Sequence, residues 1–215
     1  MKQEIIRQYK KVPGLTISED GHVITTPLPS DDGKREGKLI TVFTKDGILF
    51  NKIDINSTTI PRFVEDPVGE TNELKINYCA GGRCELRLKS GECTYLTAGE
   101  IAVDAGQALN TYYYPGGEYR GFEVVVSMQE SDDKSVLGDK FVVPKILYEN
   151  CAHYERPWIR NAGRFLAGFH DSFSYYLDEQ LGSDLIYIKC VELITYLSKL
   201  DFEEAQLKRT YYTTS

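Results

Sequence analysis

The sequence predicts an α+β protein that is mainly β, with an antiparallel β-barrel followed by an antiparallel pair of helices. Between residues 38 and 130, apolar and polar residues alternate in short segments separated by glycine turns, as in strands with one buried face. After residue 140, apolar residues instead recur at helical spacing. We therefore expect an N-terminal arm (1–37), a barrel (38–130), a helical segment (140–205) and the start of a linker (206–215).

The barrel strands are predicted from β-branched and aromatic runs. Residues 39–44 form such a run and end at Asp46-Gly47, a pair that favours a hairpin turn back into 48–55. Between 73 and 127, period-2 segments are separated by glycine turns, including one at 80–82. Many short strands with regular turns are typical of an antiparallel barrel or sandwich. The alternation does not identify which face of each strand points inward, because a one-residue shift in register exchanges the two faces.

The final helix carries a wide apolar stripe. Within 185–200, Ile186, Cys190, Leu193 and Leu197 recur at intervals of three or four residues. We interpret this stripe as the interface of a homodimer formed through the C-terminal helices. The alternative is that the stripe packs only on its own barrel. An earlier helix is predicted at about 162–181.

Composition excludes several classes of protein. The net charge is −7 and the pI about 5.1, with no long run of Lys or Arg, so this chain alone is not expected to bind nucleic acid. Five cysteines form no paired framework, which argues against a secreted disulfide scaffold. The N-terminus has no apolar signal core and no segment is long enough to span a bilayer. We expect a cytoplasmic protein without membrane association.

The residues that support metal or covalent chemistry are sparse. Residues 39–128 contain no histidine, so the cluster of His and carboxylate ligands that a metal-binding barrel needs is missing there. Three cysteines, at 79, 84 and 93, fall on adjacent predicted strands, but without CxxC spacing, which favours buried apolar thiols. Glu85 and Glu100 are a conceivable acid–base pair, although strand carboxylates more often face solvent. We expect no metal, no cofactor and no enzymatic activity.

A small-molecule site inside the barrel fits what remains. A small antiparallel barrel has room for side chains or for one small ligand. The polar-tipped residues that we expect to line it are Tyr78, Arg83, Tyr95, Tyr112 and Tyr114. Tyrosines offer an aromatic face and a hydroxyl, and an arginine is suited to clamp an anionic or carbonyl-bearing ligand. The alternative is that these side chains face outward or fill the barrel.

Three segments resemble a known family. They are LKINYCAGGRCELRLKSGECTYLTAGEIAV (74–103), YYYPGGEYRGFEV (112–124) and VELITYLSKLD (191–201). Together they resemble the N-terminal sensor and dimerisation domain of AraC/XylS-family bacterial transcriptional regulators. The resemblance implies a cupin-like barrel with a two-helix dimerisation element, followed by a DNA-binding domain with two helix-turn-helix units. The sequence shows no such second domain, so we interpret the chain as an excised sensor; the alternative is a natural regulator that lacks the DNA-binding domain.

The expected function is therefore effector sensing. A small molecule in the barrel would favour one placement of the helical pair, and DNA would be contacted only through the domain absent from this chain. Two alternatives remain open. A cupin-type small-molecule enzyme would contain a stoichiometric metal, and a ligand-free dimerisation module would have a filled barrel.

Overall fold

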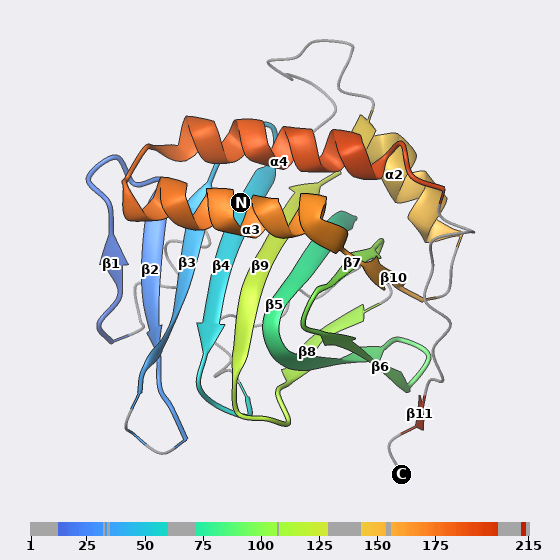
Figure 1. Ribbon diagram of the computed structural model, residues 1–215, viewed down its shortest axis with the longest axis horizontal. Coiled ribbons are helices and arrows are strands. Elements are labelled where there is room, and N and C mark those ends of the chain that lie inside the picture. The colour runs from blue at the N-terminus through green and yellow to red at the C-terminus, as the bar shows by residue number, and fades with distance from the viewer. Residues whose placement is uncertain are drawn as a thin grey trace.

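The computed structural model describes residues 13–31, 33, 35–59, 72–106, 108–128, 143–153, 156–201 and 212–213 (Figure 1). The strands are β1 (Thr16–Ile17), β2 (Val23–Leu28), β3 (Gly37–Phe43), β4 (Ile48–Ile55), β5 (Glu73–Leu88), β6 (Glu92–Thr97), β7 (Glu100–Asp104), β8 (Ala108–Tyr113), β9 (Tyr119–Ser127), β10 (Trp158–Asn161) and β11 (Tyr212–Thr213). The helices are α2 (Val143–Ala152), α3 (Gly163–Asp178) and α4 (Ser183–Leu197).

Two antiparallel sheets share the long strand β5. The first runs β1-β2-β3-β4-β9-β5-β7-β10, and the second places β8 and β6 on the two sides of the C-terminal half of β5, with β11 beyond β6. Helices α3 and α4 lie side by side across one face of the first sheet (Figure 1). This arrangement confirms the predicted class, a mainly β protein with an antiparallel barrel followed by an antiparallel helical pair.

The turn predicted at residues 80–82 is wrong, because the chain stays extended there. β5 is a single strand of 16 residues that bends at a bulge between Cys79 and Gly81. Gly82 has a φ of +81°, and a Cβ at this position would lie 2.1 Å from the Glu118 carbonyl oxygen. The glycines therefore permit a sharp bend and a close approach of β9 rather than a reversal of the chain.

The hairpin between β3 and β4 forms at the predicted Asp46-Gly47 pair. Asp46 and Gly47 have φ angles of 54° and 67°, the left-handed conformation for which this residue pair is favoured. The strands of the hairpin pair along their length, from Phe43 with Leu49 to Lys38 with Asp54. The predicted arm also contributes to the barrel, because β2 pairs with β3 over its whole length. The boundary expected at residue 37 is thus not a structural boundary.

Alternation along the strands separates two cores. On β4, β5 and β9, the side chains of Phe50, Ile76 and Phe122 face the helices, and the intervening residues face the barrel interior. The ring of Phe173 on α3 lies 4.3 Å from Phe50 and 5.0 Å from Phe122, measured between ring centroids. The helix layer therefore packs directly on the back of the barrel wall.

The apolar stripe of α4 lies in this helix–sheet core. Ile186, Cys190, Leu193 and Leu197 are at most 1% exposed and pack within their own chain. They are thus not available in this arrangement for contact with a second chain, which corrects the interpretation of the stripe as a dimer interface. The physical reason is that one face of a sheet must be covered by another layer, and the helical pair provides it.

Several large apolar side chains on the helices face outward instead. Phe165 and Tyr175 on α3 and Ile188 on α4 are 52%, 58% and 57% exposed. Within the described part of the chain, no helix combines the length and the apolar character needed to cross a membrane.

Candidate functional site

A cavity of about 180 Å³ lies between the two sheets. Its lining comes from β3, β4, β5, β6 and β9, together with the end of β8. The lining residues are Leu39, Asn51, Ile53, Asn77, Cys84, Leu86, Leu96, Tyr112, Tyr114, Tyr119 and Glu123. Most of these side chains are apolar or aromatic, and a few polar groups converge among them. This composition is typical of small-molecule sites.

One wall of the cavity is a row of polar side chains across the first sheet. Thr41, Asn51, Glu123 and Asn77 occupy facing positions on β3, β4, β9 and β5. The Thr41 hydroxyl donates to the Asn51 amide oxygen at 2.8 Å, and the Asn51 amide nitrogen donates to the Glu123 carboxylate at 2.9 Å. These bonds fix the orientation of the Asn51 amide and hold the Glu123 carboxylate in the cavity wall.

A second part of the lining, the aromatic wall, is formed by Tyr112, Tyr114 and Tyr119, which flank the β8–β9 turn. Tyr114 and Tyr119 are 2% and 3% exposed, and their rings lie 5.1 Å apart at an angle of 41°. Burial raises the pKa of Tyr112, Tyr114 and Tyr119 well above the ordinary value for tyrosine. All three therefore remain neutral phenols at physiological pH and present ring faces and hydroxyl groups.

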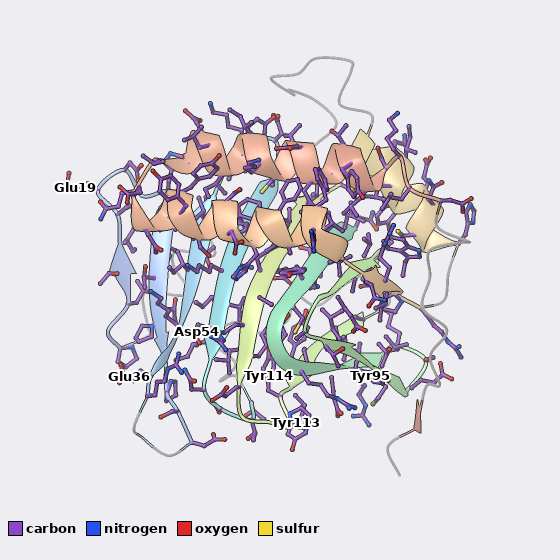
Figure 2. All side chains as sticks on the ribbon, in the orientation of Figure 1. Glu19, Glu36, Asp54, Tyr95, Tyr113 and Tyr114 are labelled. Atoms are coloured by element: carbon purple, nitrogen blue, oxygen red, sulfur yellow. The ribbon has the colours of Figure 1, made fainter. Side chains whose placement is uncertain are left out.

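Two of the five predicted site residues border the cavity. Tyr112 and Tyr114 line it, as expected. Figure 2 shows Tyr114 beside the lower part of β9, and its neighbour Tyr113 is 45% exposed and does not line the cavity. Their role in binding stays a prediction.

The other three predicted residues lie elsewhere. Tyr78 faces the helices and contacts Phe122 and His170, with centroids 5.3 and 5.9 Å apart. Arg83 stacks on Tyr95, its guanidinium carbon 4.2 Å from the ring centroid, and pairs with a neighbouring glutamate. The prediction that Tyr78, Arg83 and Tyr95 line the cavity is therefore wrong. The cause is the bulge in β5, which shifts the alternation so that odd positions face inward before it and even positions after it.

The residues that give the cavity its polarity are not among the predicted site residues. Asn51, Asn77 and Glu123 are polar residues within otherwise apolar or alternating strands, and Tyr119 follows the Pro-Gly-Gly turn. The available signal was Glu123 between the apolar Phe122 and Val124, and Asn51 directly after the apolar run 48–50, on strands that are covered on both faces. In such strands a polar residue is unusual and requires a partner.

The groups considered for metal or acid–base chemistry do not form a shared centre. Among the residues that the structure describes, no group of three His, Cys, Asp or Glu side chains is placed to hold a metal. Glu85 pairs with Arg83 at 2.7 Å, and Glu100 accepts the Thr97 backbone N–H at 2.7 Å. Cys79 and Cys84 are buried free thiols, and burial raises the pKa of Cys79 to about 12. These thiols are therefore protonated and unreactive.

A second, larger hollow of about 720 Å³ lies between the β1-β2 edge and the α3–α4 turn. Glu19, Asp20, Gln180 and Ser183 are among its polar residues. This hollow is a surface groove, whereas the barrel cavity brings together buried and half-buried phenols, amides and a carboxylate from several strands. We therefore take the barrel cavity as the candidate site.

Comparison with known proteins leaves the family open. None of the family models and none of the curated proteins compared matches this chain. Among solved structures, protein Ylba from E. coli (DUF861) is similar over 59% of this chain and 43% of its own, at 12% identity and a TM-score of 0.31. The EutQ protein of Clostridium difficile is 14% identical over 54% of this chain and 75% of its own, with a TM-score of 0.29.

A third similar structure is a protein of unknown function (DUF1255) from Acinetobacter sp. ADP1. It is 14% identical over 54% of this chain and 81% of its own, with a TM-score of 0.16. The chain thus spans less than half the length of the E. coli protein. Likeness at these levels does not bear on function, so the chemistry of the site rests on its own residues.

Proposed function

We propose that this chain is a ligand-binding domain that takes one small molecule into the barrel cavity. The observation that carries the proposal is a cavity of about 180 Å³ bordered by Asn51, Glu123, the half-buried Tyr112 and the buried Tyr114 and Tyr119. A concave, mostly apolar cavity with a few convergent polar groups is the usual form of a small-molecule site. The cavity also disfavours a ligand-free dimerisation module, for which a filled barrel is expected.

The size of the cavity limits the ligand. A buried apolar cavity of roughly 150 Å³ accepts a benzene ring. The barrel cavity, at about 180 Å³, therefore suits a molecule of about one ring. The amide, carboxylate and phenol groups on its walls would orient a ligand that has both an apolar body and polar atoms.

A cavity-filling substitution tests this proposal. Leu39→Trp places a larger side chain in the cavity, and Leu109→Trp is the matched control at a position that is 38% exposed. In a thermal-shift screen of small metabolites, a ligand at 100 times its Kd should raise the Tm of the unsubstituted chain and the control by about 5–10 °C. The Leu39→Trp variant should show no shift. An equal shift in that variant would place the ligand elsewhere.

We propose in addition that binding is relayed to the helices, in the sensor role that the AraC/XylS resemblance implies. Support comes from β9 and β5, which carry cavity residues on one face and helix contacts on the other. Phe122 touches Phe173, and Tyr78 lies next to His170 on the same helix. A ligand that shifts these strands would change the placement of α3. DNA would be contacted by a domain outside this chain.

Hydrogen exchange tests the relay separately from binding. A ligand found in the screen should change the exchange rates of backbone amides in α3, although it contacts none of them. In a Phe122→Leu variant that still binds, the change in α3 should be smaller. Protection confined to the cavity strands would show that binding is not relayed to the helices.

A dimer formed through the helices would use outward side chains such as Phe165 and Ile188.

A further inference from the structure

We infer that the ligand of the barrel cavity is a small organic cation, held between the Glu123 carboxylate and the faces of the cavity tyrosines. The inference rests on the proposed function, since it names the class of molecule that the same cavity takes. It is carried by the charges on the interior face and by the geometry of the aromatic wall.

The first observation is that Glu123 lacks a cationic partner in the described part of the chain. Its carboxylate accepts a hydrogen bond from the neutral amide of Asn51 at 2.9 Å, and Asn77 occupies the facing position on its other side. Among the described ion pairs, none includes Glu123. Glu123 is half-buried, and a carboxylate partly shielded from water is stabilised by a positive charge. A cationic ligand would supply that charge.

The interior lysine is engaged elsewhere. Lys75 lies two residues before Asn77 on β5, on the same face, and is 9% exposed. Its ammonium group lies 3.6 Å from the Glu73 carboxylate, and Asp104 faces it on β7. Acidic groups therefore outnumber this lysine along the interior faces of β5, β7 and β9, since Glu100 faces inward as well. The interior potential favours a cation over an anion.

The aromatic wall favours the same class of ligand. Tyr112, Tyr114 and Tyr119 border the cavity, and the rings of Tyr114 and Tyr119 form two inclined surfaces. The electron-rich face of an aromatic ring attracts a cation, most strongly where water is excluded. The arginine once expected to bind an anion in the barrel, Arg83, instead pairs with Glu85 outside the cavity. Nothing among the described lining residues offers a positive charge to an anion.

A pair of isosteric compounds isolates the charge. Choline and 3,3-dimethylbutan-1-ol have nearly the same shape, but only choline is charged. Benzoate serves as an anion of similar size. Isothermal titration calorimetry with each compound is carried out on the full chain, on Glu123→Gln, and on the control Glu118→Gln, which removes an exposed carboxylate in the β8–β9 turn. Glutamine keeps an oxygen that can accept from Asn51, so the fold is expected to persist, as checked by circular dichroism.

We expect choline to bind at least about tenfold more tightly than its neutral isostere, and Glu123→Gln to remove this preference while Glu118→Gln retains it. Tyr114→Phe, which keeps the ring, should preserve choline binding, and Tyr114→Leu should weaken it. Equal binding of the two isosteres, or tighter binding of benzoate, would overturn the cation assignment and leave the proposed function intact. Binding of none of the three, together with a broad ligand screen without hits, would overturn both.

Discussion

Phe122 and Glu123 are consecutive residues on β9, and their side chains enter opposite layers of the molecule. The Phe122 ring packs on Phe173 of α3, and the Glu123 carboxylate accepts the Asn51 amide in the barrel wall. The two environments are therefore separated by the thickness of one strand. Changes on either side of β9 are expected to have distinct and separable effects on stability and on binding.

The aromatic contacts of Phe173 should account for much of the adhesion between α3 and the sheet. Phe173 is 1% exposed, and Phe173→Ala should lower the free energy of unfolding by about 3–5 kcal/mol, because it leaves a cavity beside Phe50 and Phe122. Phe165→Ala makes the same change at a half-exposed position of the same helix and should cost about 1 kcal/mol or less. Urea unfolding measures both. Equal losses would mean that α3 is not anchored through Phe173.

Gly121 should tolerate no side chain. A Cβ at Gly121 would lie 2.0 Å from the Tyr78 carbonyl oxygen, a backbone atom that cannot turn away. Gly121→Ala should therefore separate β9 from β5 and cost about 2–3 kcal/mol or more. Gly116→Ala is the control, since nothing lies within 4 Å of its added methyl group. Its unfolding free energy should change by about 0.5 kcal/mol or less.

The free energy of unfolding of the ligand-free protein should fall in alkaline solution. Burial raises the pKa of Tyr114 and Tyr119, so above about pH 10 the unfolded chain loses phenol protons that the folded chain keeps. Because the unfolded state then binds fewer protons, the free energy of unfolding decreases as the pH rises. Each such tyrosine contributes about 1.4 kcal/mol per pH unit.

Replacing one of these tyrosines tests the alkaline effect directly. Tyr119→Phe should reduce the slope of stability against pH above pH 10, measured by urea unfolding at several pH values. Tyr113→Phe, at the exposed neighbouring position, is the matched control. A slope that is unchanged in Tyr119→Phe would show that other groups cause the alkaline loss.

A charge in the α4 stripe should unfold the protein rather than dissociate a dimer. Leu193 is fully buried, so Leu193→Glu would place an unpaired carboxylate in the helix–sheet core and abolish cooperative folding. Ile188→Glu, on the same helix but 57% exposed, should change the unfolding free energy by about 0.5 kcal/mol or less. Circular dichroism with sedimentation velocity distinguishes the results. A folded, monomeric Leu193→Glu variant would restore the dimer interpretation of the stripe.

Much of the fold was predictable because local signals agree with it. The run at residues 39–44, the Asp46-Gly47 turn and the return strand reproduce the β3–β4 hairpin. The helical spacing after residue 162 matches α3 and α4 to within a few residues. In these segments the hydrophobic period and the turn residues indicate the same structure, so tertiary contacts have little to override.

The site was less predictable, because it depends on one backbone irregularity. The glycines at 81 and 82 are equally compatible with a turn and with a bend in a continuous strand, and only the pairing of β5 with β9 distinguishes these two structures. Because of the bulge before Gly81, odd-numbered residues of β5 face inward before it and even-numbered residues face inward after it. Tyr78 and Arg83 therefore face away from the cavity, and Cys84 and Leu86 line it. The strand carrying Glu123 is far from Asn51 in sequence, and local patterns contain no signal of that pairing.

The bend in β5 also affects how the chain can be divided. Because one continuous ladder passes from the first sheet into the second through Cys79, Gly81 and Gly82, the two sheets are not separable modules. A cut or a circular permutation between residues 79 and 82 would remove the shared strand from both at once, whereas new termini in the exposed turn at Ser90-Gly91 would leave it whole. Split-protein fragments that end in this turn should therefore reassociate, and fragments that end at the bend should not.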